Sequence, residues 1–209
     1  RVEIFEGDAG EVVEGCEVVL VGLLPGVAEE VLPGVRFGER CLVVSMMATV
    51  KYERLVSLVG LPEERVVRTV PLPSNARRVG PILAFPFHQE AKILLEEIGT
   101  PVFAGSEKEF QTMTVITSMI SFFFAICGTL QQWCIQNGVA STVARDYLGA
   151  FYSGLAASAV HSAESYAEMT EEAATPGGLN EQVHRRMGEK GVYRAVEAMA
   201  GEVKARLEG

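Results

Sequence analysis

The chain has 209 residues, 48% of them hydrophobic, and a formal net charge of −9 at pH 7. The acidic balance argues against nucleic acid as the main partner, because binding to phosphate backbones needs clustered Lys and Arg. Four cysteines without a CxxC pair and three scattered histidines indicate a reduced, cytoplasmic protein that holds no metal ion.

Residues 1–105 alternate short apolar runs with amphipathic segments, a pattern typical of a parallel sheet covered by helices. The runs expected to be strands are residues 17–23, 41–46, 65–70, 81–85 and 101–103, and the expected helices are 28–32, 51–59 and 88–98. In open α/β sheets, ligands bind beyond the carboxyl ends of the strands. This rule places on one edge the residues Leu23, Leu24, Pro25, Met47, Ala48, Pro71, Leu72 and Pro73.

Residues 110–144 contain no Asp, Glu, Lys, Arg or His. Within them, residues 113–130 approach the length of about 20 apolar residues that a membrane span needs. Thr and Ser inside the run, Gln and Asn after it and the absence of a flanking basic cluster favour a helix buried on nearly all sides instead. A chain of this size can bury such a helix only against a second copy, so we expect an obligate homodimer, with higher oligomers open, and no membrane partner.

The remaining residues predict three further helices, at 145–169, 179–189 and 192–207, the last two separated by Gly191. The predicted organisation is therefore a sheet domain over residues 1–105 and an all-helical domain over residues 106–209. On the first of these helices, His161 is interpreted as a core histidine bonded to a backbone carbonyl, with proton transfer as the alternative.

The segment Thr175-Pro176-Gly177-Gly178 precedes the helix at 179–189 and is the best candidate for a site. It is interpreted as a helix start, with Thr175 as the cap and Pro176 at an early helical position. Such a turn leaves backbone N–H groups unpaired at the positive end of the helix dipole, where a carboxylate or phosphate can bind. The alternative is a loop between helices with no further role.

These features together resemble the pyrroline-5-carboxylate reductase family over almost the whole chain. Residues 175–178 are similar to its Ser/Thr-Pro-Gly-Gly-x-Thr signature, and residues 18–25 and 68–80 are similar to its Val-Lys-Pro and Asn-Thr-Pro segments. The resemblance implies a Rossmann-type domain that binds NADP or NAD, an interleaved helical homodimer, and hydride transfer to the C=N carbon of a small cyclic imino acid, as in proline biosynthesis.

The resemblance also implies roles for particular residues. The substrate carboxylate is expected on the backbone of Pro176, Gly177, Gly178 and Leu179, with Thr117 lining the pocket and Asn180 and Thr175 as candidate catalytic residues. Thr117 has an alternative interpretation, since a Thr in a buried helix often bonds to its own backbone. The cofactor is expected at the edge formed by residues 23–25, 47–48 and 71–73.

The sequence departs from the family pattern in three places. No G-x-G-x-x-G phosphate loop occurs, and the chain opens on residues 1–5 without Met, so a first strand, helix and second strand are expected to be missing. Asn180 replaces the final Thr of the signature. Leu24 and Leu72 replace the polar Lys and Asn, which favours a different or larger substrate. Two other functions therefore stay open: a dehydrogenase acting on a carbonyl or hydroxyl, and a non-catalytic dinucleotide-binding dimer.

Overall fold

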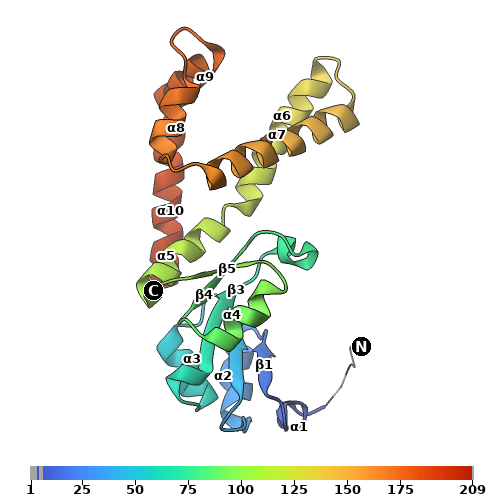
Figure 1. The fold of residues 1–209 in the computed structure, drawn as a ribbon, viewed down its shortest axis with the longest axis vertical. Coiled ribbons are helices and arrows are strands. Elements are labelled where there is room, and N and C mark those ends of the chain that lie inside the picture. The colour runs from blue at the N-terminus through green and yellow to red at the C-terminus, as the bar shows by residue number, and fades with distance from the viewer. Residues whose placement is uncertain (1–3, 5–6, 209) are drawn as a thin grey trace. The chain divides into compact units, whose positions relative to one another are not determined.

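The computed structural model describes residue 4 and residues 7–208 of the chain, and these form two compact units. One unit contains the residues up to Thr117 together with residues 206–208, and the other contains Ser118–Ala205 (Figure 1). Of the opening residues 1–5, on which the expectation of missing elements partly depends, only Ile4 lies within the described residues.

The first unit is built on a sheet whose five strands, among the described residues, follow the order β1-β2-β3-β4-β5. The strands are β1 (Val18–Val21), β2 (Leu42–Ser45), β3 (Val66–Val70), β4 (Pro81–Phe85) and β5 (Thr100–Phe103). β1, β2 and β3 are parallel, and β4 is parallel to β5.

The pair β3–β4 is antiparallel, with Val70 opposite Leu83, so the expectation of an entirely parallel sheet is wrong at this pair. The reason is the connection. Only residues 71–80 join the two strands, and they contain the short 3-10 helix η3 (Pro73–Arg77). A parallel crossover needs a dozen or more residues, usually with an α-helix. The carboxyl edge of β1–β3 is therefore shared with the amino ends of β4 and β5.

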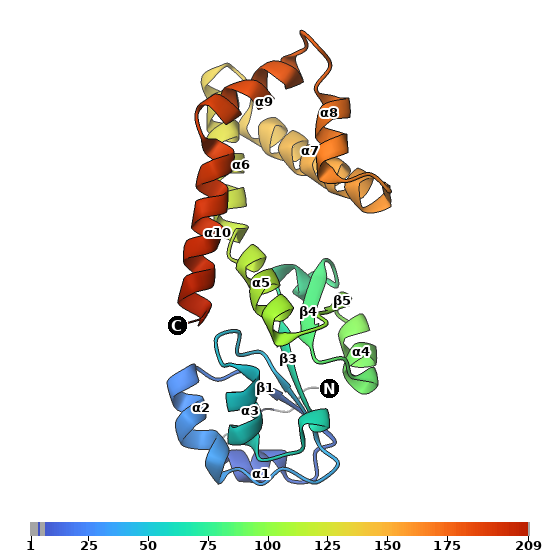
Figure 2. The ribbon, with the colours of Figure 1, turned by 90° about the vertical axis from the view of Figure 1, so that its left-hand side faces the viewer.

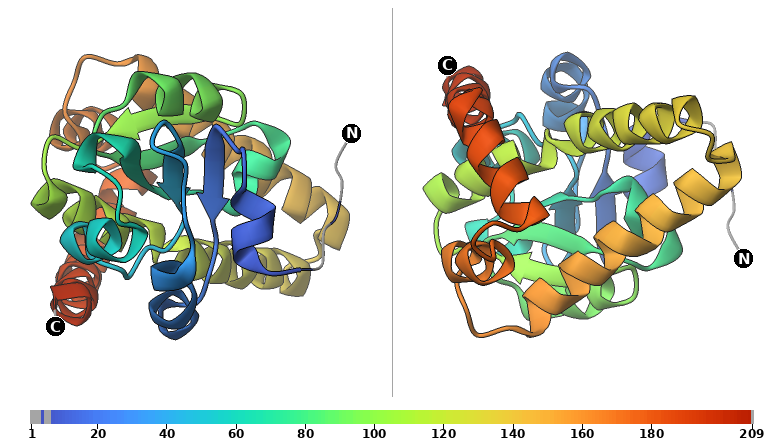
Figure 3. Two further views of the ribbon diagram at one scale, coloured as in Figure 1. Left: turned by 90° about the horizontal axis from the view of Figure 1, so that it is seen from below. Right: turned by 90° about the horizontal axis from the view of Figure 1, so that it is seen from above.

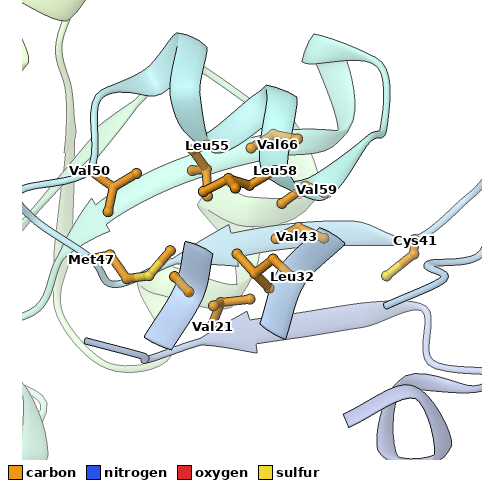
Figure 4. Packing of buried hydrophobic residues seen from close by; sticks show 11 residues of the cluster. Val21, Leu32, Cys41, Val43, Met47, Val50, Leu55, Leu58, Val59 and Val66 are labelled. Carbon is orange, nitrogen blue, oxygen red and sulfur yellow. The ribbon is translucent and has the colours of Figure 1, made fainter. Parts of the chain in front are cut away.

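Helices cover both faces of this sheet. They are α1 (Ala9–Val13), α2 (Pro25–Val31), η1 (Leu32–Gly34), α3 (Tyr52–Val59), η2 (Glu63–Arg65) and α4 (Gln89–Glu96). On one face, Leu55 of α3 packs in a buried cluster with Val43 and Val66 (Figure 4). Helix α4 lies on the other face (Figure 2). Its Ala91 and Leu95 belong to a second buried cluster. Successive strand residues point to opposite faces, and the inner strands β2, β3 and β4 are largely apolar because both of their faces are covered. In the edge strand β1, Val18 and Leu20 are exposed.

Helix α5 (Glu107–Thr117) also packs on the sheet of the first unit. Its Phe110 is fully buried in a cluster with Val70, Leu83 and Ala104. The compact unit thus extends to Thr117, beyond the boundary at residue 105 that the sequence predicts, and that boundary stays a prediction.

The second unit is helical. Its elements are α6 (Ile120–Gln136), α7 (Ser141–His161), α8 (Tyr166–Ala173), α9 (Leu179–Glu189) and most of α10 (Val192–Glu208). α6 and α7 form a contacting pair joined by residues 137–140 (Figure 3).

The single helix expected over residues 145–169 is wrong, because the chain leaves α7 after His161 and begins α8 at Tyr166. A capping box causes this restart. The Ser165 hydroxyl accepts the Glu168 N–H (3.3 Å), and the Glu168 carboxylate accepts the Ser165 N–H (2.7 Å). His161 at the end of α7 is exposed in the single chain, so the burial expected of a core histidine is not reached within one chain.

The apolar segment at 113–130 is divided between two helices, because α5 ends at Thr117 and α6 begins at Ile120. Within the single chain, α6 has no buried residue, and Phe124 and Trp133 are 64% and 61% exposed. The burial expected for this segment is therefore not reached within one chain. By length and composition alone, the stretch Glu107–Gln136 could cross a membrane.

Candidate functional site

The segment Thr175–Gly178 forms a closed turn between α8 and α9. The Gly178 N–H donates to the Thr175 carbonyl (2.8 Å), and Gly177 has a φ of +76°. Proline at the second position and a positive φ at the third are the features of a type II turn, which requires Gly at that third position. A Cβ on Gly178 would lie 2.9 Å from the Thr175 carbonyl oxygen, which is too close, so the turn leaves no room for a side chain at this second glycine. The sequence Thr-Pro-Gly-Gly thus dictates the local backbone.

The turn ends before helix α9 begins. The N-cap of α9 is Gly178, which has no side chain to cap the helix. The expectation that Thr175 caps this helix and that Pro176 lies inside it is therefore wrong, because the turn closes on itself first. The Gly178 N–H is also used within the turn. The donors that remain are the N–H groups of Leu179, Asn180 and Glu181, since the first N–H groups of an α-helix have no intrahelical acceptor. With the helix dipole behind them, these donors suit an anion.

Asn180 lies on the first turn of α9 and lines a groove of about 440 Å³ within the helical unit. The other lining residues are mostly apolar: Leu155, Ala159, Tyr166, Met169, Thr170, Ala173, Ala174, Val183, His184 and Tyr193. His184 Nδ1 lies 3.1 Å from the Tyr193 hydroxyl in this groove. The sequence alone does not reveal this pair, because the two residues lie on different helices, α9 and α10. The groove places hydrogen-bonding groups beside an apolar surface, as a small-molecule site requires.

The other residues predicted for the substrate site are placed as follows. Thr175, Pro176 and Leu179 are exposed. Thr117 belongs to the other compact unit, at the end of α5, and its hydroxyl donates to the Thr114 carbonyl (2.6 Å). This is the local backbone bond named as the alternative for Thr117.

The loops predicted to hold the cofactor leave the sheet at one edge. The register aligns Val21 of β1 with Ser45 of β2, and Ser45 with Arg68 of β3, so the residues that follow these strands lie at the same end. Residues 23–25, 47–48 and 71–73 are brought together in this way, although their role in cofactor binding stays a prediction.

The side chains of this edge differ in exposure. Leu24 is 75% exposed, whereas the side chain of Met47 is buried in the core cluster. A ligand at the loop after β2 would therefore contact the backbone of Met47 and the residue Ala48. Leu72 and Pro71 are half-buried. The loop from Leu72 to Gly80 is closed by buried Asn75, which accepts the Leu72 N–H (2.6 Å) and donates to the Val79 carbonyl (3.1 Å).

An ion pair between a buried arginine and a half-buried glutamate underlies this edge. Arg68 of β3 is 2% exposed and pairs with Glu107 at the start of α5, and it lies over the ring of Phe110 at 4.4 Å. Burial lowers the pKa of Arg68, and the negative charge and hydrogen bond of Glu107 oppose this shift. Arg68 is absent from the site residues expected from the sequence, although a charged residue inside the otherwise apolar run 66–70 indicates a buried charge that needs a partner.

Among the described residues, no group of three His, Cys, Asp or Glu side chains is placed to hold a metal ion. The four cysteines are free thiols.

Comparison with known proteins addresses the fold and the helical domain. Residues 107–208 match the family model of pyrroline-5-carboxylate reductase dimerisation. The chain is similar in structure to a 1-pyrroline-5-carboxylate reductase from Streptococcus pyogenes, with a TM-score of 0.80 and 18% identity over 95% of this chain and 78% of that one. No curated protein matches the sequence of this chain.

Two further solved structures share the fold. A pyrroline carboxylate reductase from Plasmodium falciparum with NADP bound gives a TM-score of 0.83 at 13% identity, over 97% of this chain and 80% of that one. A pyrroline-5-carboxylate reductase from Coxiella burnetii gives a TM-score of 0.78 at 17% identity, over 97% of this chain and 79% of that one.

These matches confirm the expected fold class, a Rossmann-type sheet domain followed by a helical dimerisation domain. The dimerisation domain supports formation of a homodimer, which would cover apolar side chains that α6 exposes in the single chain. The helical part of the chain, residues 107–208, belongs to the pyrroline-5-carboxylate reductase dimerisation family, and the chain as a whole shares the fold of the pyrroline-5-carboxylate reductases.

Proposed function

We propose that the protein is an NAD(P)H-dependent reductase that reduces the C=N bond of a small cyclic imino acid. The observation that carries this proposal is the closed type II turn at residues 175–178, followed directly by the free N–H groups of α9. This arrangement suits the carboxylate of an imino acid, and it occurs in a chain of the family whose members reduce pyrroline-5-carboxylate.

In this proposal the chain contributes position and electrostatics. The substrate carboxylate binds at the backbone of Gly177, Gly178 and Leu179, next to the N–H groups that open α9. The side-chain amide of Asn180 donates a hydrogen bond to the ring nitrogen, or holds the water that protonates it. The cofactor, NADP or NAD, supplies the hydride when it is bound.

The edge of the sheet partly fits this cofactor. Exposed Leu24 and the adjoining loops present apolar surface suited to a nicotinamide ring. No glycine-rich phosphate loop occurs in residues 7–208, so no pyrophosphate site is assigned. Leu24 and Leu72, which stand where the family has polar residues, favour a substrate with a larger apolar part than pyrroline-5-carboxylate itself.

The turn can be tested with two glycines of the same backbone conformation. Gly177 has φ +76° and Gly191, between α9 and α10, has φ +74°. Replacing either with Ala should cost about 1 kcal/mol of stability, because a side chain disfavours positive φ. We expect Gly177→Ala, and more severely Gly178→Trp, to raise the KM for Δ1-pyrroline-5-carboxylate in an assay of the full-length protein with NADPH. Gly191→Ala should leave the KM unchanged. Equal effects of Gly177→Ala and Gly191→Ala would reject the turn as the carboxylate site.

The same assay separates the other functions. Turnover of a cyclic ketone with NADPH, or of a hydroxy acid with the oxidised cofactor NADP, without turnover of the imine, would identify a carbonyl or hydroxyl dehydrogenase. Binding of NADPH without turnover of any of these substrates would identify a non-catalytic dinucleotide-binding dimer. For the assembly, light scattering after size exclusion should give a dimer or a higher oligomer at micromolar concentration, and a monomer would contradict the proposal.

A further inference from the structure

Arg68 connects four segments of the first unit beneath the loop between β2 and α3. Its Nη2 donates to the Ala48 carbonyl (2.8 Å), and its Nη1 pairs with Glu107 Oε1. The same oxygen of Glu107 accepts the N–H of Tyr52, the first residue of α3 (3.1 Å). One guanidinium and one carboxylate thereby join β3, the β2–α3 loop, α3 and α5.

The contact with Ala48 fixes a peptide group in a tight turn. The Val50 N–H donates to the Met47 carbonyl (3.3 Å), so Ala48 and Thr49 are the two central residues of this turn. The Ala48 carbonyl and the Thr49 N–H belong to the same peptide, which is trans, and in a trans peptide these two groups point in opposite directions. Because Arg68 holds the carbonyl toward the buried side, the Thr49 N–H points away from it.

The central peptide of such a turn has two orientations. Type I and type II turns differ mainly by a rotation of this peptide, and type II needs a positive φ at the third residue. Thr49 is not among the described residues with positive φ, and a β-branched residue disfavours that conformation. The hydrogen bond from Arg68 and the identity of Thr49 thus favour the same orientation.

A buried arginine is an inefficient way to stabilise a loop. Desolvation opposes burial of the pair, and replacement of a buried ion pair by apolar residues is often neutral or stabilising. Within the pair, Arg68 Nε and Glu107 Oε2 are buried without a hydrogen-bond partner. The pair gives the Ala48–Thr49 peptide a defined orientation, and this peptide lies beyond the carboxyl end of β2, at the edge where ligands of such sheets bind.

We propose that Arg68, held by Glu107, is a positioning residue that presents the Thr49 N–H as a hydrogen-bond donor to an oxygen atom of the bound nicotinamide dinucleotide. This inference rests on the proposed function, which supplies the dinucleotide. It predicts that Arg68 acts on ligand binding through the backbone of Thr49 without touching the ligand.

The test combines binding with the NMR signal of one amide in the full-length protein. With threonine labelled by ¹⁵N, titration with NADPH should shift the Thr49 amide resonance. Arg68→Met should shift that resonance before any ligand is added and should weaken NADPH binding about tenfold, the effect of one hydrogen bond. Arg68→Lys keeps one donor toward Ala48 and should recover part of the affinity. The control is Arg65→Met. Arg65 directly precedes β3 and pairs with Glu90, so this variant should change neither the Thr49 amide resonance nor the NADPH affinity.

A second variant avoids the buried charge. Thr49→Gly removes the penalty on positive φ and frees the peptide to rotate, so it should weaken NADPH binding several-fold while the unfolding temperature changes little. If Arg68→Met fails to fold, Thr49→Gly and Arg68→Lys decide the question. Unchanged NADPH affinity in the folded variants would overturn the role of Arg68 and leave the proposed function intact. Failure of the unmodified protein to bind NADPH or NADH would overturn both.

Discussion

Replacing Phe110 tests whether α5 is part of the sheet unit in solution. Phe110 is fully buried among Val70, Leu83 and Ala104, with the Arg68 guanidinium 4.4 Å from the centre of its ring. Truncation of a buried Phe to Ala costs about 3–5 kcal/mol, which includes the cavity. For a unit of this size the loss corresponds to a decrease of roughly 10–20 °C in unfolding temperature.

The control is Phe87→Ala. Phe87 is 61% exposed and makes an edge contact with Phe103 at 5.0 Å between ring centres. Loss of this contact should cost about 1 kcal/mol. Phe110→Leu, which keeps most of the apolar volume, should fall between the two and provides a measurement if Phe110→Ala does not fold.

The two units can be followed separately. Trp133, the chain's single tryptophan, lies on α6 in the helical unit, so its fluorescence reports on that unit. Amide hydrogen exchange of β3 and β4 reports on the sheet unit. Phe110→Ala should accelerate exchange in the strands. A stability loss no larger than that of Phe87→Ala would show that α5 does not pack on the sheet.

Two further predictions concern single side chains. Burial, with the negative charges of Glu63, Glu107 and Glu64, raises the pKa of Tyr52 to about 12. The folded state therefore holds this proton more tightly than the unfolded chain, and stability should fall as the pH rises from about 10 to 12. Tyr52→Phe should flatten that fall in urea titrations, whereas an unchanged slope would contradict the assignment. Ser165→Ala removes the cap of α8 and should cost about 1 kcal/mol, measured by thermal unfolding, and an unchanged unfolding temperature would argue against the capping box.

The sequence alone determined those features that depend on local backbone chemistry and hydrophobic periodicity. The strand at 81–85 follows from an apolar run covered on both faces, the strand at 18–21 lies within the predicted run 17–23, and α9 has the predicted bounds. The turn at 175–178 could be predicted because Pro restricts φ and Gly tolerates positive φ. The gathering of the loops after β1, β2 and β3 follows from parallel strands ending at one edge.

Tertiary structure decided what depends on contacts between distant residues. The antiparallel pairing of β4 was decided by the limited reach of residues 71–80. Arg68 and Glu107 are 39 residues apart, and His184 and Tyr193 lie on different helices, so no local spacing revealed either pair. The packing of Phe110 on β3 and β4 also depends on tertiary structure, because these strands are far from Phe110 in the sequence. The local sequence pattern shows only that residue 110 is apolar.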